Sequence, residues 1–127
     1  GYFNVGDVVI MTSALLLGRK YGAYIGAIGP ALADLFLGYA VFVPITFVVK
    51  GIEGYLVGTV YNNKTTTSAL VATIIGGIVI VAGYFIAEYF VFDPGVAIAS
   101  ILTNTIQAVM SVIVSMILYA ILRKRLG

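Results

Sequence analysis

The chain is dominated by apolar runs that are too long for the core of a soluble domain. One such run, from Ser68 to Phe92, contains a single charged residue, Glu88. A helix needs about 20 mostly apolar residues to cross a bilayer, and in lipid such a run satisfies its backbone hydrogen bonds as a helix. Charged residues make up 9% of the chain and apolar residues 61%, whereas ordinary globular proteins have about 25% and 45–50%. The sequence therefore predicts an all-α membrane protein embedded in a lipid bilayer.

Five apolar segments follow one another along the chain. The polar stretch 62–67 separates the third from the fourth, and the turn signal at 93–95 separates the fourth from the fifth. There is no linker, internal repeat or low-complexity tract, so residues 1–127 are expected to form one bundle. The expected transmembrane spans are 5–18, 21–39, 41–61, 68–92 and 96–122.

The basic residues lie in every second connection and at the C-terminal end. Those outside the spans are Arg19, Lys20, Lys64 and the cluster Arg123 to Arg125. By the positive-inside rule these regions and the C-terminus are cytoplasmic, in a multi-pass protein of the bacterial plasma membrane. The polar start, residues 2–7, is then external, and no signal peptide is visible. We therefore expect a sixth helix before Gly1, which would place both termini inside.

Missing residue types exclude several kinds of site. The chain has no His and no Cys, which excludes the usual zinc sites, disulfides, thiol nucleophiles and Ser-His-Asp triads. A net charge of +2, concentrated at one end, does not indicate nucleic-acid binding. No Gly-rich Lys-Ser/Thr loop for nucleotide phosphates is present. We expect no enzyme activity, no metal and no cofactor.

Polar side chains within the spans fall in one half of the membrane. Such residues are costly in lipid and by default mark function. A helical rise of about 1.5 Å per residue places six of them between the midplane and the external surface. They are Asp34, Lys50, Glu53, Glu88, Asn104 and Gln107. An ion relay would need polar groups in both halves, so this asymmetry favours a pocket that captures a ligand from outside. Asn4 and Tyr84 complete the candidate substrate-binding set.

Each candidate residue has a purely structural alternative. Lys50 and Glu53 could neutralise each other at i,i+3 spacing, and Asp34 and Glu88 could be solvated near the surface. The two amides of the fifth segment could bond neighbouring helices, and Tyr84 could be an interface aromatic. Our hypothesis is that Lys50 lies in the bundle interior and faces both the ligand and at least one of Glu53 and Glu88.

Small residues form a face on each of two segments. These residues are Gly22, Gly26, Gly29 and Ala33 on the second segment, and Gly51, Gly54 and Gly58 on the third. Such faces let helices approach closely. They are predicted to pack against each other within the bundle rather than against a partner protein.

A set of short motifs covers nearly the whole chain. They are Gly1-Tyr-Phe-Asn-Val-Gly-Asp7, residues 14–23, Ala31-Leu-Ala-Asp34, Lys50-Gly-Ile-Glu-Gly54, Gly83-Tyr-Phe-Ile-Ala-Glu88 and Asn104-Thr-Ile-Gln107. Together they resemble the S components of energy-coupling factor (ECF) vitamin transporters, in particular the riboflavin-type subgroup. The resemblance implies six helices and capture of a water-soluble vitamin from outside. The implied partners are a transmembrane coupling protein and two ATPase subunits. The family's first helix has no counterpart before Gly1.

The chemistry of the polar set suits a small ring with several hydrogen-bonding groups. Lys50 would donate a hydrogen bond to a ring oxygen, and Glu88 or Glu53 would accept one from an amine or hydroxyl. The amides of Asn104 and Gln107 would form hydrogen bonds with the edge of the ring, and Tyr84 would stack on its face. Pyridoxine-like or hydroxymethylpyrimidine-like rings fit, and riboflavin is possible. The main alternative is a small proton-coupled homodimeric exporter that uses Glu53 or Glu88 as proton carrier. A third is a structural membrane subunit without a ligand.

Overall fold

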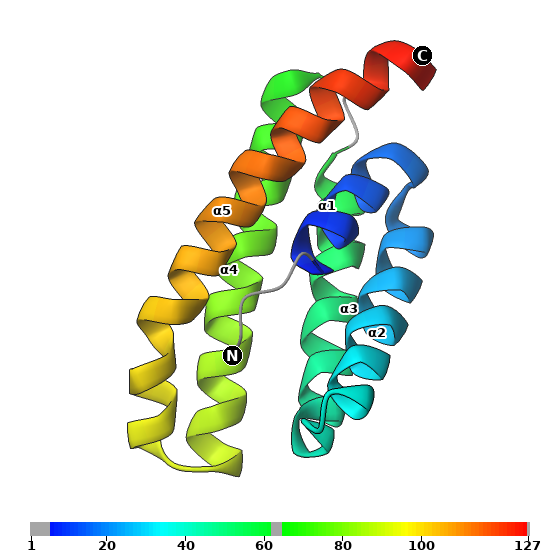
Figure 1. Ribbon diagram of the computed structural model, residues 1–127. Helices are drawn as coiled ribbons and strands as arrows, with labels where there is room; N and C mark the ends of the chain where they lie inside the picture. The colour runs from blue at the N-terminus through cyan, green and yellow to red at the C-terminus, as the bar shows by residue number, and fades with distance from the viewer. Residues whose placement is uncertain (1–5, 62–64, 127) are drawn as a thin grey trace.

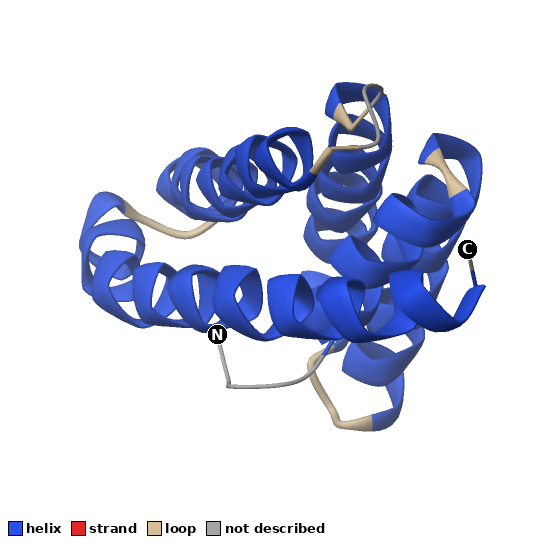
Figure 2. Cartoon of the chain, turned by 90° about the horizontal axis from the view of Figure 1, so that it is seen from above, coloured by secondary structure: helices blue, strands red, loops and turns tan. Residues whose placement is uncertain are grey.

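The computed structural model describes residues 6–61 and 65–126, and the regular elements in these ranges are all helical. They are α1 (Gly6–Leu17), α2 (Arg19–Phe36), the 3-10 helix η1 (Ala40–Phe42), α3 (Val43–Val60), α4 (Thr66–Val91) and α5 (Pro94–Leu126). Figure 2 shows these helices joined by short loops. The predicted all-α fold is confirmed.

Local backbone chemistry accounts for where the helices begin and end. α2 continues through Pro30 and ends at Phe36, just before Gly38, whose φ of +88° is a left-handed conformation that glycine adopts readily. Pro44 lies in the first turn of α3, where its missing N–H costs nothing. α4 begins two residues before the predicted span because Thr65 caps it and accepts a hydrogen bond from the Ser68 backbone nitrogen at 3.1 Å.

The bundle has two distinct ends. In Figure 1 the α2–α3 and α4–α5 connections lie together at one end, here called the turn end. The start of α4 and the C-terminus lie at the other, with the α1–α2 connection on the same side. This second end carries Arg19, Lys20, Arg123 and Lys124, and is called the basic end. α4 and α5 form an antiparallel pair beside the group made by α1, α2 and α3.

Three stretches of helix are long and apolar enough to cross a membrane. They are Ala40–Val60, Thr66–Val91 and Pro94–Lys124, of which 39%, 33% and 28% respectively is buried inside the bundle. Their exposed side chains are largely aliphatic and aromatic, as a lipid-facing surface requires. α1 is apolar but has only 12 residues, and α2 includes three charged residues among its 18. The protein is a multi-pass membrane protein.

α2 and α3 pack with their backbones in contact. Gly22 and Gly54 face each other, and Gly26 faces the α3 backbone. A Cβ at any of the three would collide with the backbone of the facing helix. Gly58 lies equally close to the start of α2. These four residues confirm the predicted close approach within the bundle, whereas Gly29 faces open space.

The apolar core fills the part of the bundle toward the basic end. Its largest buried side chains include Met11 of α1, Val57 of α3, Ile80 of α4 and Tyr119 of α5. The polar residues predicted from sequence therefore lie mainly on the other side of this core, toward the turn end.

Candidate substrate-binding site

A small polar cavity lies between α2, η1 and α3 on one side and α4 and α5 on the other. Its volume is about 50 Å³, and it is lined by Pro30, Asp34, Tyr39, Phe42, Thr46, Lys50, Ile80, Tyr84, Asn104 and Gln107. Five of the predicted site residues are in this lining. They come from four helices and are brought together because each lies at a similar depth on a face that points inward.

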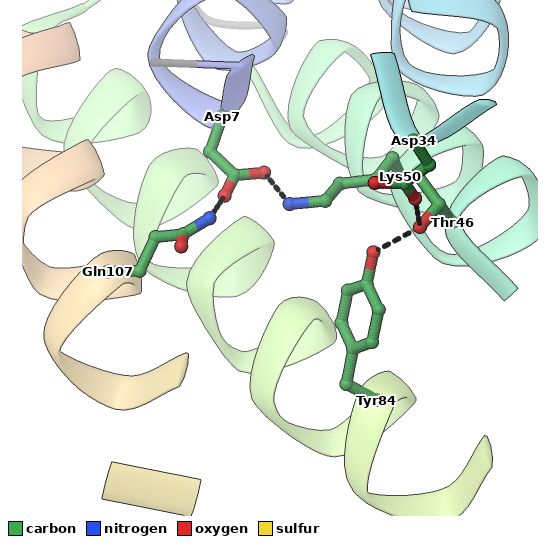
Figure 3. Close-up of polar contacts among 6 residues, drawn as sticks. All are labelled: Asp7, Asp34, Thr46, Lys50, Tyr84 and Gln107. Carbon is green, nitrogen blue, oxygen red and sulfur yellow. Dashed lines mark hydrogen bonds and ion pairs between the residues drawn. The ribbon is translucent and has the colours of Figure 1, made fainter. Parts of the chain in front are cut away.

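One chain of hydrogen bonds crosses the cavity from α2 to α4. Thr46 Oγ1 donates to Asp34 Oδ2 at 2.5 Å and lies 2.9 Å from the Tyr84 hydroxyl (Figure 3). A threonine hydroxyl has one proton, so the Tyr84 hydroxyl is the donor in the second bond. The Tyr84 oxygen thereby keeps a lone pair with which to accept a hydrogen bond from a ligand.

A second polar cluster joins α1, α3 and α5. Lys50 Nζ forms an ion pair with Asp7 Oδ1 at 2.5 Å, and Gln107 Nε2 donates to Asp7 Oδ2 at 2.5 Å (Figure 3). Lys50 Nζ also lies 5.5 Å from the centroid of the Tyr84 ring, within the range of a cation–π interaction. The ammonium is therefore in the bundle interior, as predicted, between Asp7 and Tyr84.

The salt-bridge partner of Lys50 is a residue that sequence reasoning did not name. Its salt bridge is to Asp7 and not to Glu53 or Glu88. Sequence reasoning placed Asp7 in an external polar start, but α1 begins at Gly6 and buries Asp7 completely in its first turn. A carboxylate is favourable there because it faces the positive end of the helix dipole. The sequence did offer a signal for this ion pair. Asp7 stands directly before an apolar run, and Lys50 lies within another apolar run and needs a partner of opposite charge.

Glu53 is fully buried but does not line the cavity. Its carboxyl lies beside Asp7 and Lys50 and interacts electrostatically with both. Neither carboxyl oxygen has a hydrogen-bond partner among the described residues. Glu53 therefore contributes to the charge balance behind Lys50 rather than to the cavity wall.

Glu88 lies one helical turn from Tyr84 toward the turn end and is outside the cavity lining. Its Oε2 accepts a hydrogen bond from Ser100 Oγ at 3.3 Å, and no described residue bonds its Oε1. Glu88 is 1% exposed and Asp34 4% exposed, so neither is a solvated surface residue. Asn4, also predicted as a site residue, lies outside the described residues.

Aromatic side chains cover the cavity at the turn end. Phe42, which lines the cavity, packs on Phe92 with ring centroids 5.3 Å apart, and on Tyr39 at 6.4 Å. The Phe42–Phe92 contact bridges η1 and the end of α4. The two sides of the cavity are therefore joined there by apolar contact.

Sequence reasoning missed two further polar residues of this region. Thr46 lies one turn before Lys50 on α3, so its spacing could have placed it on the same face. Ser100 lies one turn before Asn104 on α5, and the same spacing applies.

The fold and this cavity define a class: helical membrane proteins with a polar cavity in one half of the bundle. Residues 1–124 match the family model described as "ECF-type riboflavin transporter, S component", and the chain belongs to that family. This is a family of transporter subunits, not of enzymes. Membership implies a vitamin substrate and partnership with an ECF module.

Two relatives match over most of this chain. An "Uncharacterized protein in gap 3'region" from Pyrococcus woesei is 42% identical over 130 residues, covering 100% of this chain and 86% of the relative. The "Thiamine precursor transporter HmpT" from Lactococcus lactis subsp. cremoris (strain MG1363) is 27% identical over 118 residues, covering 93% of this chain and 68% of the relative.

Proposed function

We propose that the protein captures a single-ring vitamin or vitamin precursor, of the hydroxymethylpyrimidine or pyridoxine type. It takes this cargo from outside the cell and delivers it through a module of one transmembrane coupling protein and two ATPase subunits. The observation that carries the proposal is the cavity, which combines hydrogen-bonding groups from four helices within about 50 Å³.

The size of the cavity favours a ligand with one ring over riboflavin, which has three. Pockets for drug-sized ligands occupy about 300–1,000 Å³, so this cavity must widen even for a single ring. The tricyclic ring and polyol chain of riboflavin would require a much larger separation of α4 and α5 from α2 and α3. Family membership is compatible with either cargo, because fold does not fix the ligand. The Lactococcus relative is named as a thiamine precursor transporter, which supports the smaller class.

The hydrogen-bonding capacity left in the cavity matches a ring with amino and hydroxymethyl groups. Lys50 gives one of its three donors to Asp7 and keeps two for a ring nitrogen or an oxygen. Gln107 binds Asp7 through its nitrogen, which leaves its carbonyl oxygen to accept from a ring amine. Asn104 supplies a second amide, and Asp34 a carboxylate with further acceptor capacity. Tyr84 packs beside the ring, Glu53 balances charge behind Lys50, and Asn4 stays in the proposed site on sequence grounds.

We further propose that the basic end faces the cytoplasm and the turn end faces outside. The clustering of basic residues at one end supports this orientation. The C-terminus is then cytoplasmic, and the cavity opens on the side from which an importer receives its cargo.

The test is binding by the purified protein in nanodiscs with no ATPase present. Isothermal titration with hydroxymethylpyrimidine, pyridoxine, thiamine and riboflavin should give nanomolar affinity for a single-ring compound and at least about 100-fold weaker binding of riboflavin. Tighter binding of riboflavin would overturn the proposed cargo class. Failure of all four compounds to bind would overturn the capture function. Weak binding of organic cations that weakens further on acidification would instead favour the proton-coupled exporter.

A further inference from the structure

The proton of the Tyr84 hydroxyl is used within the protein. Thr46 Oγ1 donates its single proton to Asp34 Oδ2 at 2.5 Å, and the Tyr84 hydroxyl lies 2.9 Å from the same Thr46 oxygen. The bond between Tyr84 and Thr46 therefore forms only if the tyrosine donates. Tyr84 is left with oxygen lone pairs, so it presents an acceptor to the cavity that both side chains line.

The orientation of the Gln107 amide is fixed in a similar way. An ionised carboxylate accepts hydrogen bonds and has none to donate. The amide nitrogen of Gln107 must therefore be the atom that faces Asp7, as it does at 2.5 Å (Figure 3). The carbonyl oxygen of the same amide is then the atom available to a ligand, and it is a second acceptor.

Lys50 presents the opposite polarity. An ammonium group has three donors and no acceptor, and one of these donors is given to Asp7 Oδ1 at 2.5 Å. Because Lys50 and Gln107 bind the two oxygens of one carboxylate, a ligand that meets them finds a donor beside an acceptor. Asn104 also lines the cavity, but its amide has both donors and an acceptor and does not discriminate by itself.

The three side chains of fixed polarity suit one arrangement of ligand atoms. Tyr84 and Gln107 accept, and Lys50 donates. A ring with an amino group beside a ring nitrogen matches this set, because the amine has two N–H donors and the ring nitrogen is an acceptor. In the corresponding oxo ring the oxygen is an acceptor and the neighbouring nitrogen carries one proton. That ring has one donor for two acceptors, and an unpaired buried acceptor is costly.

We propose that Thr46 is a positioning residue that sets the specificity of the site. By accepting the Tyr84 proton it keeps that hydroxyl an acceptor, so the cavity selects an amino-substituted nitrogen ring over the corresponding oxo ring. This inference rests on the proposed function and specifies its substrate class. Among single-ring cargoes it favours hydroxymethylpyrimidine, whose amino group adjoins a ring nitrogen, over pyridoxine, which has no amino group. A site that hydrogen-bonds an N–H group of its substrate strongly rejects an analogue that lacks this group.

The first measurement compares two probes of nearly equal size. They are hydroxymethylpyrimidine and the same compound with its amine replaced by an oxo group, each titrated into the full chain in nanodiscs at a pH where both are uncharged. We expect the amino compound to bind at least about 100-fold more tightly than the oxo compound. Pyridoxine is titrated beside them and should also bind more weakly than the amino compound.

Three variants test the contribution of Thr46. Thr46→Val keeps the side-chain shape but cannot accept from Tyr84, whose hydroxyl is then free to donate to an oxo oxygen. The preference for the amino compound should therefore fall by about tenfold or more. Thr46→Ser keeps the hydroxyl and should retain the preference within about threefold. Thr73→Val is the matched control at a buried residue whose hydroxyl bonds backbone oxygens of its own helix, and it should leave the preference within about twofold.

The outcomes separate this inference from the proposed function. If the oxo compound or pyridoxine binds as tightly as the amino compound, the inference is overturned while capture of a single-ring cargo stands. An unchanged preference in Thr46→Val also overturns it. So does an equal loss of preference in Thr46→Ser, because packing and not the hydroxyl would then set the preference. If riboflavin alone binds, or if no compound binds, the proposed function fails and the inferred specificity fails with it.

Discussion

Lys50 of α3 and Asp7 of α1, which are 43 residues apart in the chain, form an ion pair of 2.5 Å whose side chains are 5% and 0% exposed. Asp7 also accepts a hydrogen bond from Gln107 of α5. One buried carboxylate thus orients two cavity-lining side chains from outside the cavity. A buried ion pair is rarely more stable than an apolar pair of the same volume, so its presence is better explained by the positioning of Lys50 and Gln107 than by stability.

Replacing Lys50 alone should destabilise the fold and weaken binding. Lys50→Met leaves Asp7 buried with only Gln107 as hydrogen-bond partner, which should lower the free energy of unfolding by about 3–5 kcal/mol. Loss of a hydrogen bond from a charged donor should weaken ligand binding by about 1.5–3 kcal/mol, or about ten- to more than a hundredfold. Thermal unfolding in detergent and ligand titration measure the two effects.

The compensating variant separates these two effects. Lys50→Met combined with Asp7→Leu removes the ion pair, so most of the lost stability should return, with Glu53 as the remaining buried carboxyl of the cluster. Affinity should stay low, because neither change restores a donor to the ligand. Wild-type affinity in the double variant would reduce Lys50 to a structural residue and would move the proposed site toward Asn104, Gln107 and Asp34.

Close packing of α2 on α3 should be sensitive to a single methyl group. Gly54→Ala places a Cβ against the Gly22 backbone, and such overpacking typically costs about 1–3 kcal/mol. The helices must separate, which also moves Asp34 away from Thr46, so ligand affinity should fall with stability. Gly29→Ala is the matched control, because its Cβ would meet open space, and it should lose neither. Equal behaviour of the two variants would contradict the observed helix contact.

The regular geometry of helices explains how much of this structure was predictable. Apolar run length predicted the helices, and the rise per residue placed Asp34, Lys50, Asn104 and Gln107 in the outer half of the bundle, where they do line one cavity. Depth along a helix does not say how helices sit against one another. α1 has 12 residues and begins within the bundle, so the depth expected for Asp7 was wrong and its ion pair with Lys50 was missed.

The orientation of the bundle can be tested by labelling, because the chain has no native cysteine. Asp93→Cys at the turn end should react with a membrane-impermeant maleimide in intact cells. Lys124→Cys at the basic end should react only after the membrane is permeabilised. Both expectations follow from the positive-inside rule. The reverse pattern would place the cavity on the cytoplasmic side and would contradict capture from outside.

Two tyrosine hydroxyls in opposite halves of the bundle allow a residue of the proposed binding site to be compared with a residue that stabilises the fold. Tyr84 lines the cavity and bonds Thr46 at 2.9 Å, whereas Tyr119 is buried near the basic end, 2.5 Å from the Tyr61 hydroxyl and 3.1 Å from Arg123 Nη1.

Tyr84→Phe removes an acceptor from the ligand and should weaken binding by about 0.5–1.5 kcal/mol, or about two- to twelvefold, with little effect on unfolding. Tyr119→Phe leaves the half-buried Tyr61 and the exposed Arg123 without their common partner. It should lower the free energy of unfolding by about 0.5–1.5 kcal/mol and leave affinity unchanged at temperatures where the protein is folded. Ligand titration and thermal unfolding of both variants measure this contrast. If Tyr119→Phe weakened binding as much as Tyr84→Phe does, the site would extend through the core to the basic end, and the assignment of ligand binding to one half of the bundle would be wrong.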